Sequence, residues 1–501
     1  MTYKPTKAGS AASTRGSYEP VIGLEVHVQL GTATKIFCGC STTFGAPPNH
    51  QTCPVCLGLP GVLPVLNRRA LEYGLRVALA LNCRIQPVLK FDRKHYFYPD
   101  LPKNFQISQY DLPLAFEGVL TVPAAADAPA LTVRVHRAHL EEDAGKLIHK
   151  EGESASLVDY NRTGVPLLEI VSEPDLRAPE EAYRYLQALK QTLQYLDVSD
   201  CDMEKGSLRC DANVSVRPAG TTPLGVKVEI KNLNSFKHVR AALAYEIVRQ
   251  GQALGEGGRV VQETRLWDDA RAVTVPMRSK EFAHDYRYFP EPDLVPFSVT
   301  AEEVESVRRA LPELPAARAA RFVTQHGLSA YDAGVMTSDK GWADYFEQAV
   351  QHGGAPKGVA NWIQGDLLAV CRERAVELPA LGLPPAHLAQ LVGLLDRKVL
   401  TSRMAKELLG PMLETGEPPE PLMRRLGMVQ VTDVSALAAV AREVVAQQAK
   451  VAADYRAGKT QALKFLVGQV MAKTKGQANP AVAHEVLEQL LREPSARQGD
   501  A

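Results

Sequence analysis

The chain has 501 residues, which excludes a single hydrophobic core and predicts two to four domains. Its 57 Lys and Arg residues balance its 57 Asp and Glu residues, so a global basic field for nucleic acid is excluded and any RNA contact must be a local patch. The composition, with 45% hydrophobic and 23% charged residues, is that of an ordinary globular protein. No apolar run approaches the roughly 18 residues of a membrane span.

The chain is expected to open with a flexible tail followed by a strand. Residues 1–18 lack acidic residues and show no apolar helical face. Residues 21–30, VIGLEVHVQL, alternate as a strand does, which puts Glu25, His27 and Gln29 on one face.

Four of the eight cysteines form a cluster near the N-terminus. The pairs CGC and CPVC, separated by twelve residues, have the spacing of a structural zinc site formed by Cys38, Cys40, Cys53 and Cys56. Four reduced thiols without metal are the alternative. The other four, at positions 83, 201, 210 and 371, are scattered, which is typical of a reducing, cytoplasmic compartment and not of a disulfide framework.

Basic and aromatic residues alternate in the segment 91–110, FDRKHYFYPDLPKNFQISQY, and DYRYFPEPD at 285–293 is similar. Aromatic rings stack on unpaired bases and cations bind phosphates, so Tyr96 and Lys103 are candidate contacts for a tRNA acceptor end. Packing of the rings in a core is the alternative.

Glutamates lie inside strands that are otherwise apolar. Besides Glu25, the strand 165–171, VPLLEIV, contains Glu169, and the strand 134–143 ends in Glu141 and Glu142. A buried carboxylate must pair, protonate or bind metal, and several glutamates with one imidazole suit Mg²⁺. Ion pairs with neighbouring Arg and Lys residues are the alternative, but three such strands in one domain favour metal.

A further strand is fully amphipathic. In LRCDANVSVR, 208–217, one face is apolar and the other carries Arg209, Asp211 and Asn213; in VKVEIK, Lys227 and Glu229 share a face. A solvated outer face is the simplest interpretation. The functional one is a sheet face that binds phosphates, with Asp211 and Glu229 available for a metal ion.

Helical periodicity replaces the strand pattern after residue 296. The sequence predicts an α+β domain at 19–296 with the cysteine insert at 38–56, and then a helical domain at 297–413 opened by a capping box at Thr300. A Pro- and Glu-rich linker at 414–421 and a helical tail at 422–501 follow. ADYRAGKT, 453–460, loosely matches a phosphate-binding loop, but a helix precedes it where a strand is required, so that motif is rejected. Asn479 and Pro480 are expected to start the last helix.

The tail carries a local basic excess. Residues 442–475 hold seven basic and two acidic residues. The candidate RNA-backbone contacts are Lys459, Lys464, Lys473 and Lys475, with a solvated helix face as the alternative.

Several strings together resemble one family over nearly the whole chain after about Tyr18: GLEVHVQL, LPGVLPVLN, FDRKHYFYPDLPKNFQISQY, HLEEDAGK, NRTGVPLLEIVSEPDL, GSLRCDANVSVRP, EIKNLNSF, DYRYFPEPDLVP and FLVGQVMAKTKGQANP. They look like the B subunits of the bacterial aspartyl/glutamyl-tRNA amidotransferases, and they occur in the family's order.

This resemblance implies an α+β fold, with a cradle related to glutamine synthetase, then a helical domain and a tail similar to YqeY proteins that contacts tRNA. It implies ATP-dependent phosphorylation of the side-chain carboxylate of Glu on tRNA(Gln) or Asp on tRNA(Asn), followed by displacement of phosphate by ammonia. By motif, the magnesium ligands, which are also the catalytic residues, are Glu25, His27, Glu142 and Glu169, with Glu141 as the alternative within HLEED. The four cysteines imply a zinc-bearing member.

The resemblance also implies partners. An amidase (the A subunit) would release ammonia from glutamine, and a small protein (the C subunit) would bridge the two in a heterotrimer. Two other functions stay open at this point: a non-catalytic RNA-binding scaffold, and an ammonia ligase acting on a free amino acid. Magnesium- and tRNA-dependent ATP cleavage separates all three.

Overall fold

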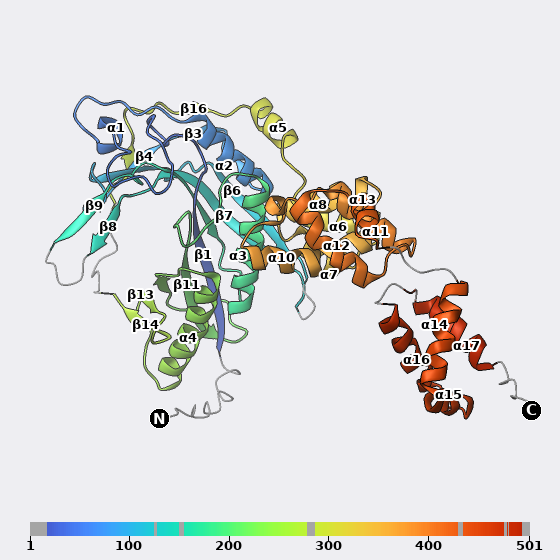
Figure 1. Cartoon of the computed structure of the whole chain (residues 1–501). Helices are drawn as coiled ribbons and strands as arrows, with labels where there is room; N and C mark the ends of the chain where they lie inside the picture. The colour runs from blue at the N-terminus through green and yellow to red at the C-terminus, as the bar shows by residue number, and fades with distance from the viewer. Residues whose placement is uncertain are drawn as a thin grey trace, which may run out of the picture. The chain divides into compact units, whose positions relative to one another are not determined.

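The computed structural model describes residues 18–124, 128–149, 155–277, 286–428, 434–474, 478 and 480–492. The chain divides into two compact units, residues 1–315 and 316–501. The first mixes strands and helices and the second is helical (Figure 1). No helix among the described residues is both long enough and apolar enough to cross a membrane.

A nine-stranded sheet forms the centre of the first unit. Its order is β14-β13-β12-β11-β1-β10-β7-β6-β2, and every neighbouring pair is antiparallel except β12 and β13. The strands are β1 (Tyr18–Gln29), β2 (Arg84–Ile85), β6 (Ala115–Val122), β7 (Leu131–Glu142), β10 (Pro166–Ser172), β11 (Leu208–Pro218), β12 (Val228–Lys231), β13 (Glu263–Asp268) and β14 (Val273–Pro276). The strands predicted from alternating sequence are therefore present, and they are neighbours in the middle of the sheet.

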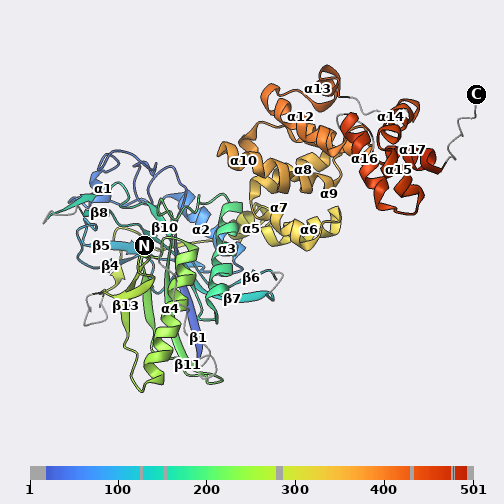
Figure 2. The same cartoon turned by 60° about the horizontal axis from the view of Figure 1, so that its bottom comes forward.

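Three helices pack against the apolar side of this sheet (Figures 1 and 2). They are α2 (Arg68–Ala80), α3 (Pro179–Tyr195) and α4 (Phe236–Gly255). Leu24, Val26 and Val28 of β1 are fully or almost fully buried in the core that these helices share with the sheet. Because side chains alternate along a strand, this burial turns Glu25 and His27 to the opposite, polar face.

Small sheets and one short helix complete the first unit. They are β4 (Asp92–His95), β5 (Phe105–Ser108) and β15 (Phe289–Pro290) in one sheet, β3 (Val88–Leu89) with β16 (Phe297–Ser298), β8 (Lys146–His149) with β9 (Ser156–Asp159), and the helix α1 (Pro54–Leu57). Residues far apart in sequence meet here, because β15 pairs with β4.

The predicted capping box is confirmed at helix α5 (Ala301–Arg309), where the Thr300 hydroxyl accepts from the Glu303 N–H and the Glu303 carboxylate accepts from the Thr300 N–H. However, Val304 and Val307 of this helix pack on the core of the first unit. The first unit therefore extends to Pro315, beyond the boundary expected at residue 296.

The second unit contains two separate hydrophobic clusters. The first is built by α6 (Pro315–His326), α7 (Ala330–Thr337), α8 (Lys340–Gln351), α9 (Pro356–Trp362), the π-helix η1 (Ile363–Leu367), α10 (Leu368–Arg374), the 3₁₀-helix η2 (Leu378–Leu381), α11 (Pro385–Asp396), α12 (Ser402–Thr415) and α13 (Pro419–Arg425). The second is built by α14 (Val434–Gln447), α15 (Ala449–Arg456), α16 (Gln461–Lys473) and α17 (Pro480–Arg492).

The structure of this unit changes one interpretation of the sequence and confirms another. The segment 414–421 is not a continuous linker, because α12 runs to Thr415 and α13 begins at Pro419, where proline is tolerated in a first helical turn. Helix α15 does precede Gly458, whose φ of +97° ends the helix, so the rejection of a phosphate-binding loop is confirmed. Asn479 lies outside the described residues.

Candidate active site

Ionisable side chains line up across the polar face of the large sheet. The backbone register places His27 of β1 opposite Glu169 of β10 and, on its other side, opposite Arg209 of β11. Glu169 in turn lies opposite His139 of β7. Glu25 lies opposite Asp211 of β11. Residues that are distant in sequence thus become direct cross-strand neighbours on one face.

The first candidate metal group contains His27, Glu141 and Glu169, each of which offers a ligand atom within 4.8 Å of the others. Glu169 Oε2 lies 3.5 Å from His27 Nε2 and 3.3 Å from His139 Nε2. Burial raises the pKa of Glu169, but the charges and hydrogen bonds of the two imidazoles outweigh it and hold the pKa well below its usual value. The carboxylate is therefore ionised, as a metal ligand must be.

The pKa of the His27 imidazole is shifted in the opposite direction. Burial lowers its pKa, but the hydrogen bond to Glu169 and the charge of that carboxylate outweigh burial and raise the pKa above its ordinary value. Oxygen ligands with one imidazole are the set that hard divalent cations prefer, so the residues fit Mg²⁺.

Glu142 does not belong to this group. It lies on the other face of β7, where both of its carboxylate oxygens accept from Lys103 Nζ, the Oε1 contact at 2.6 Å, and Oε2 also accepts from the Ile107 N–H. The neighbouring Glu141 shares its face with His139 and takes the place that the family motif had suggested for Glu142. The structure therefore corrects this assignment from Glu142 to Glu141.

A second acidic group lies further along the same face. Glu25, Asp211 and Glu229 each offer an oxygen within 4.8 Å of the others. Lys231 Nζ lies 2.8 Å from Asp211 and 3.1 Å from Glu229, and the Asn213 side chain donates to Glu25 at 2.8 Å. Burial, with the charge of Glu169 adding to it, raises the pKa of Glu25. This excess of negative charge fits a second divalent cation.

A cavity of about 370 Å³ joins the two groups. Its lining includes His27, Glu141 and Asp211 from the large sheet and Lys94 and Tyr96 from the segment that begins with β4. Among the predicted phosphate contacts, Arg209 lines it too but is paired with Asp143 at 2.8 Å. Lys227 is exposed and does not line it.

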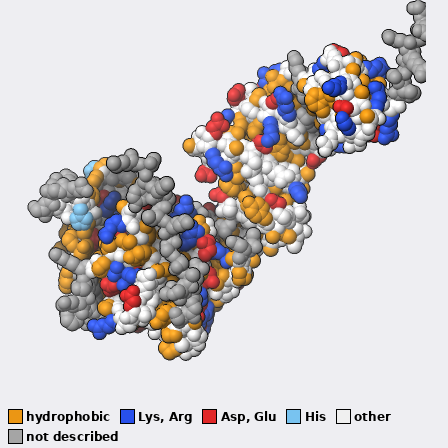
Figure 3. Space-filling model, turned by 90° about the horizontal axis from the view of Figure 1, so that it is seen from below, with side chains coloured by type: hydrophobic (Ala, Val, Ile, Leu, Met, Phe, Trp, Pro, Cys, Tyr) orange, Lys and Arg blue, Asp and Glu red, His pale blue; other side chains and the backbone are white. Residues whose placement is uncertain are grey.

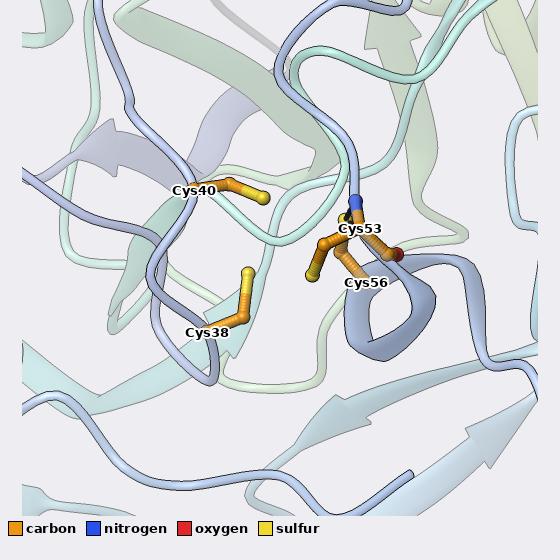
Figure 4. A group of neighbouring side chains, drawn as sticks. All are labelled: Cys38, Cys40, Cys53 and Cys56. Atoms are coloured by element: carbon orange, nitrogen blue, oxygen red, sulfur yellow. Dashed lines mark hydrogen bonds between the residues drawn. The ribbon is translucent and has the colours of Figure 1, made fainter.

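The four clustered cysteines point toward one another (Figure 4). Their sulfurs all lie within 4.8 Å of each other, close to the separation of about 3.8 Å in a tetrahedral site with Zn–S bonds of about 2.3 Å. Cys53 and Cys56 are fixed by α1, where the Cys53 N–H donates to Cys56 Sγ at 3.2 Å. The hydrogen bond with Cys38 lowers the pKa of Cys56 to about 5, which favours a thiolate.

A fully buried lysine supports this cluster. Lys35 has no solvent exposure, and its ammonium donates to the carbonyls of Gln51 at 2.7 Å and Tyr160 at 3.3 Å and to Cys56 Sγ at 3.7 Å. A cation next to these sulfurs would offset part of the charge that four metal-bound thiolates carry. Because Gln51 lies within the cysteine insert and Tyr160 lies outside it, Lys35 also ties the insert to the body of the domain.

The residues predicted to contact tRNA differ in their surroundings, and not all of them are free to bind RNA. Tyr96 lines the cavity, but Lys103 is 7% exposed and bound to Glu142, so it is not available to an RNA backbone and that prediction is corrected. In the tail, Lys459 pairs with Asp454 at 3.0 Å, Lys473 pairs with Glu443, and Lys464 is exposed. Lys475 lies outside the described residues. Figure 3 shows Lys and Arg side chains on the visible face of the tail helices.

Sequence reasoning did not assign two residues to the site: Lys94 and His139. His139 was detectable, because it precedes Glu141 by two residues and a strand places such residues on one face. Lys94 was part of the basic and aromatic segment, but only the pairing of β4 with β5 and β15 brings it over the cavity.

Comparisons with known proteins relate the chain to one family. Residues 20–305 match the family model of the GatB/GatE catalytic domain, and residues 344–491 match that of the GatB domain. The chain is 53% identical over 483 residues to the B subunit of the aspartyl/glutamyl-tRNA(Asn/Gln) amidotransferase of Carboxydothermus hydrogenoformans, covering 96% of this chain and 99% of the relative.

Two further relatives of the same name have a similar sequence identity to this chain. The protein from Moorella thermoacetica is 55% identical over 476 residues, which cover 95% of this chain and 100% of the relative. The one from Myxococcus xanthus is 51% identical over 474 residues, covering 95% and 98%. With this identity over nearly the full length of both chains, the protein belongs to the family of aspartyl/glutamyl-tRNA(Asn/Gln) amidotransferase B subunits.

Proposed function

We propose that this chain is the component of a tRNA-dependent amidotransferase that activates the side-chain carboxylate of Glu on tRNA(Gln), of Asp on tRNA(Asn), or of both, for amidation. The observation that carries the proposal is the polar row across β11, β1, β10 and β7, from which four ionisable groups, His27, Glu141, Arg209 and Asp211, border one cavity. The names of the relatives supply the substrate class.

The chemistry requires two displacements. An oxygen of the substrate carboxylate attacks the γ-phosphorus of ATP, the bond to the bridging oxygen breaks, and ADP leaves with the electron pair. The nitrogen of ammonia then attacks the acyl carbon, the carbon–oxygen bond to phosphate breaks, and the nitrogen loses a proton. A carboxylate is a poor electrophile toward ammonia, and its conversion to an acyl phosphate supplies the leaving group.

His27, Glu141 and Glu169 would hold one Mg²⁺, and Glu25, Asp211 and Glu229 a second. Bound Mg²⁺ supplies neutralisation of phosphoryl charge. The protein residues position these ligands: His139 orients Glu169 from the side opposite His27, and Asn213 fixes Glu25. No side chain is needed as a nucleophile, because catalysis of phosphoryl transfer consists mainly of positioning and charge stabilisation.

The other parts of the chain receive supporting roles in this proposal. The first unit would be a cradle like that of glutamine synthetase, since its sheet leaves one polar face free of the packed helices. Cys38, Cys40, Cys53 and Cys56 would hold a structural Zn²⁺, because four thiolates leave no open position. The tail around α16 would contact the tRNA backbone through Lys459, Lys464 and Lys473.

Ammonia would come from other proteins of a complex. The name of the relatives implies such a complex, and the proposed partners are an amidase, the A subunit, and a small bridging protein, the C subunit. The decisive experiment is amidation by the reconstituted complex, assayed separately with Glu-tRNA(Gln), Asp-tRNA(Asn) and the free amino acids. We expect Mg²⁺- and tRNA-dependent release of ADP and formation of the amide. Tight tRNA binding without ADP release would identify an RNA-binding scaffold, and amidation of a free amino acid would identify a ligase of another class.

A further inference from the structure

Side chains from neighbouring strands hold the carboxylates of the second acidic group, and two of these side chains are neutral. The Asn213 side chain donates to Glu25 Oε1 at 2.8 Å, and the Thr264 hydroxyl of β13 donates to Glu229 Oε2 at 2.7 Å. The other oxygen of Glu229, Oε1, lies 3.1 Å from Lys231 Nζ. A neutral donor orients a carboxylate without cancelling the charge that attracts a metal ion, whereas an ammonium competes with that ion.

The strand register brings Thr264 to this position. Asn213 of β11 lies opposite Glu229 of β12, and Glu229 lies opposite Thr264 of β13. The three residues therefore form one line across three strands on the polar face of the sheet. Glu229 is the member of the acidic group that β12 supplies, and β12 has only four residues. The position of its carboxylate therefore depends on the strands on either side.

Strand β13 is itself fixed from the opposite face of the sheet. Arg265, the residue after Thr264, lies 3.6 Å from the fully buried carboxylate of Glu246 in α4. Its guanidinium also donates to the hydroxyl and to the carbonyl oxygen of Thr274 in β14, both at 2.8 Å, and the Thr274 hydroxyl donates to Glu246 at 2.8 Å. A buried polar network of this kind makes the surrounding structure rigid. The Thr264 hydroxyl therefore projects from a firmly held strand, as the support of a preorganised site must.

From this arrangement we infer that Thr264 is a positioning residue, whose hydroxyl holds the Glu229 carboxylate in the orientation that binds the second divalent cation. The inference rests on the proposed function, in which the second acidic group holds a metal ion, and adds to it a residue that acts through Glu229. Hydrogen-bond partners of metal ligands typically contribute about 10- to 100-fold to metal affinity. Without the hydroxyl, the orientation of Glu229 would depend on Lys231, whose ammonium competes with a metal ion for the same carboxylates.

The first test measures metal binding by the reconstituted complex without substrates. The probe is Mn²⁺, which shares the oxygen preference of Mg²⁺ and whose free ion is detected by electron paramagnetic resonance. Thr264→Val removes the hydroxyl but keeps the branched shape, Thr264→Ser keeps the hydroxyl, and Glu229→Gln identifies the binding event that belongs to the second group. We expect Thr264→Val to weaken that event about 10- to 100-fold and to leave the other event unchanged. Thr264→Ser should bind Mn²⁺ nearly as the wild type does.

The second test measures ADP release across a Mg²⁺ titration. Thr264→Val should need about 10- to 100-fold more Mg²⁺ for half-maximal activity, with kcat at saturating Mg²⁺ close to that of the wild type. Thr121→Val is the matched control, because Thr121 is an exposed threonine in β6 of the same sheet, and it should behave as the wild type. Valine is favoured in strands, so the thermal unfolding midpoint of Thr264→Val should also stay close to the wild-type value.

Several outcomes would overturn the inference. Wild-type Mn²⁺ affinity in Thr264→Val would do so and leave the proposed function intact. Equal losses in Thr264→Val and Thr264→Ser, or a lowered midpoint with both binding events weakened together, would make Thr264 a general support of the sheet. A lowered kcat at saturating Mg²⁺ with unchanged metal affinity would make its hydroxyl a substrate contact. A wild-type complex that lacks the binding event removed by Glu229→Gln would refute the second metal ion of the proposed function itself.

Discussion

The central carboxylate of the polar row offers the sharpest test of the proposed metal site. Glu169 lies between two imidazoles, with its Oε2 3.5 Å from His27 Nε2 and 3.3 Å from His139 Nε2, and it shares the group with Glu141. Glu169→Gln keeps the shape and the carbonyl oxygen of the side chain but removes one of the two negative charges in this group. The fold should survive, whereas the group loses half of its attraction for a divalent cation.

The expected cost follows from that change. Removing one preorganised charged or polar group from a site of developing charge raises a barrier by about 3 to 4 kcal/mol, and each 1.36 kcal/mol is about tenfold in rate. We therefore expect tRNA-dependent ATP cleavage to fall about 100- to 1000-fold and the Mg²⁺ concentration for half-maximal activity to rise. Binding of tRNA should be nearly unchanged, because the substitution lies in the cavity and not on the basic tail.

Glu173→Gln is the matched control. Glu173 follows the same strand and also contacts a histidine, with its Oε1 2.9 Å from His136 Nδ1, but that pair is solvent-accessible and outside the cavity. Such surface pairs contribute about 0 to 1 kcal/mol, so activity should remain at the wild-type level. The measurement that tests the metal assignment is ADP release across a Mg²⁺ titration. Equal rates and equal Mg²⁺ dependence in wild type and Glu169→Gln would refute the metal assignment.

Two further predictions concern the zinc cluster and the tail. Purified protein should contain about one zinc per chain, and Cys53→Ser should lose it, whereas Cys83→Ser should not; elemental analysis finding no zinc in the wild type, with all four clustered thiols reactive, would contradict this. Deleting residues 429–501, which spares the buried Leu422 and Met423, should flatten the slope of log affinity for tRNA against log salt by about four if four lysines contact phosphates; an unchanged slope would mean that the tail does not bind RNA.

The strands of the site could be predicted from the sequence because alternation is a local property. Glu25, His27 and Glu169 were identified in this way, since a carboxylate inside an apolar strand needs a partner wherever the strand lies. The cysteine cluster was equally local, because spacing along the chain brings its two pairs together. Helix α5 belongs to the first unit because it packs against residues that are distant in sequence. Helical periodicity could not reveal that packing.

The choice between Glu141 and Glu142 shows where strand patterns fail. Val133 and Val135 are buried, so uninterrupted alternation would turn Arg137, His139 and Glu141 toward the helices. The pairing of β7 with β10 shifts at Val171 and Ser172, which face Arg137 and Val135, and this irregularity reverses the alternation. Ala138 and Leu140 are therefore the buried residues that follow, and Glu141 faces the cavity. An irregularity of one residue moves every later side chain to the opposite face.

The same distinction, between what lies near in sequence and what lies near in space, separates Lys94 from Lys103. Both belong to one basic and aromatic segment, yet Lys103 is held by Glu142 while Lys94 borders the cavity. Residue type and spacing predicted cations in this segment. Only the strand pairing shows which one has a carboxylate partner.

The last prediction concerns what the chain does not do: alone, it should release no glutamate from glutamine. Hydrolysis of an amide by a cysteine requires a thiolate with a base and an oxyanion hole. Burial raises the pKa of Cys83 to about 12 and of Cys201 to about 11, and it also raises the pKa values of Cys210 and Cys371. These four thiols therefore stay protonated, and the other four form the candidate zinc site.

The measurement is glutaminase activity of the single chain beside that of the complete complex. With ammonium chloride the chain should be limited only by its own phosphorylation step, whereas with glutamine it should need the proposed amidase partner. Glutamate release by the single chain at a rate comparable to that of the complex would refute this division of labour. Loss of that release in Cys201→Ser or Cys83→Ser would then identify the thiol responsible, because buried thiols that only pack tolerate serine without a change in chemistry.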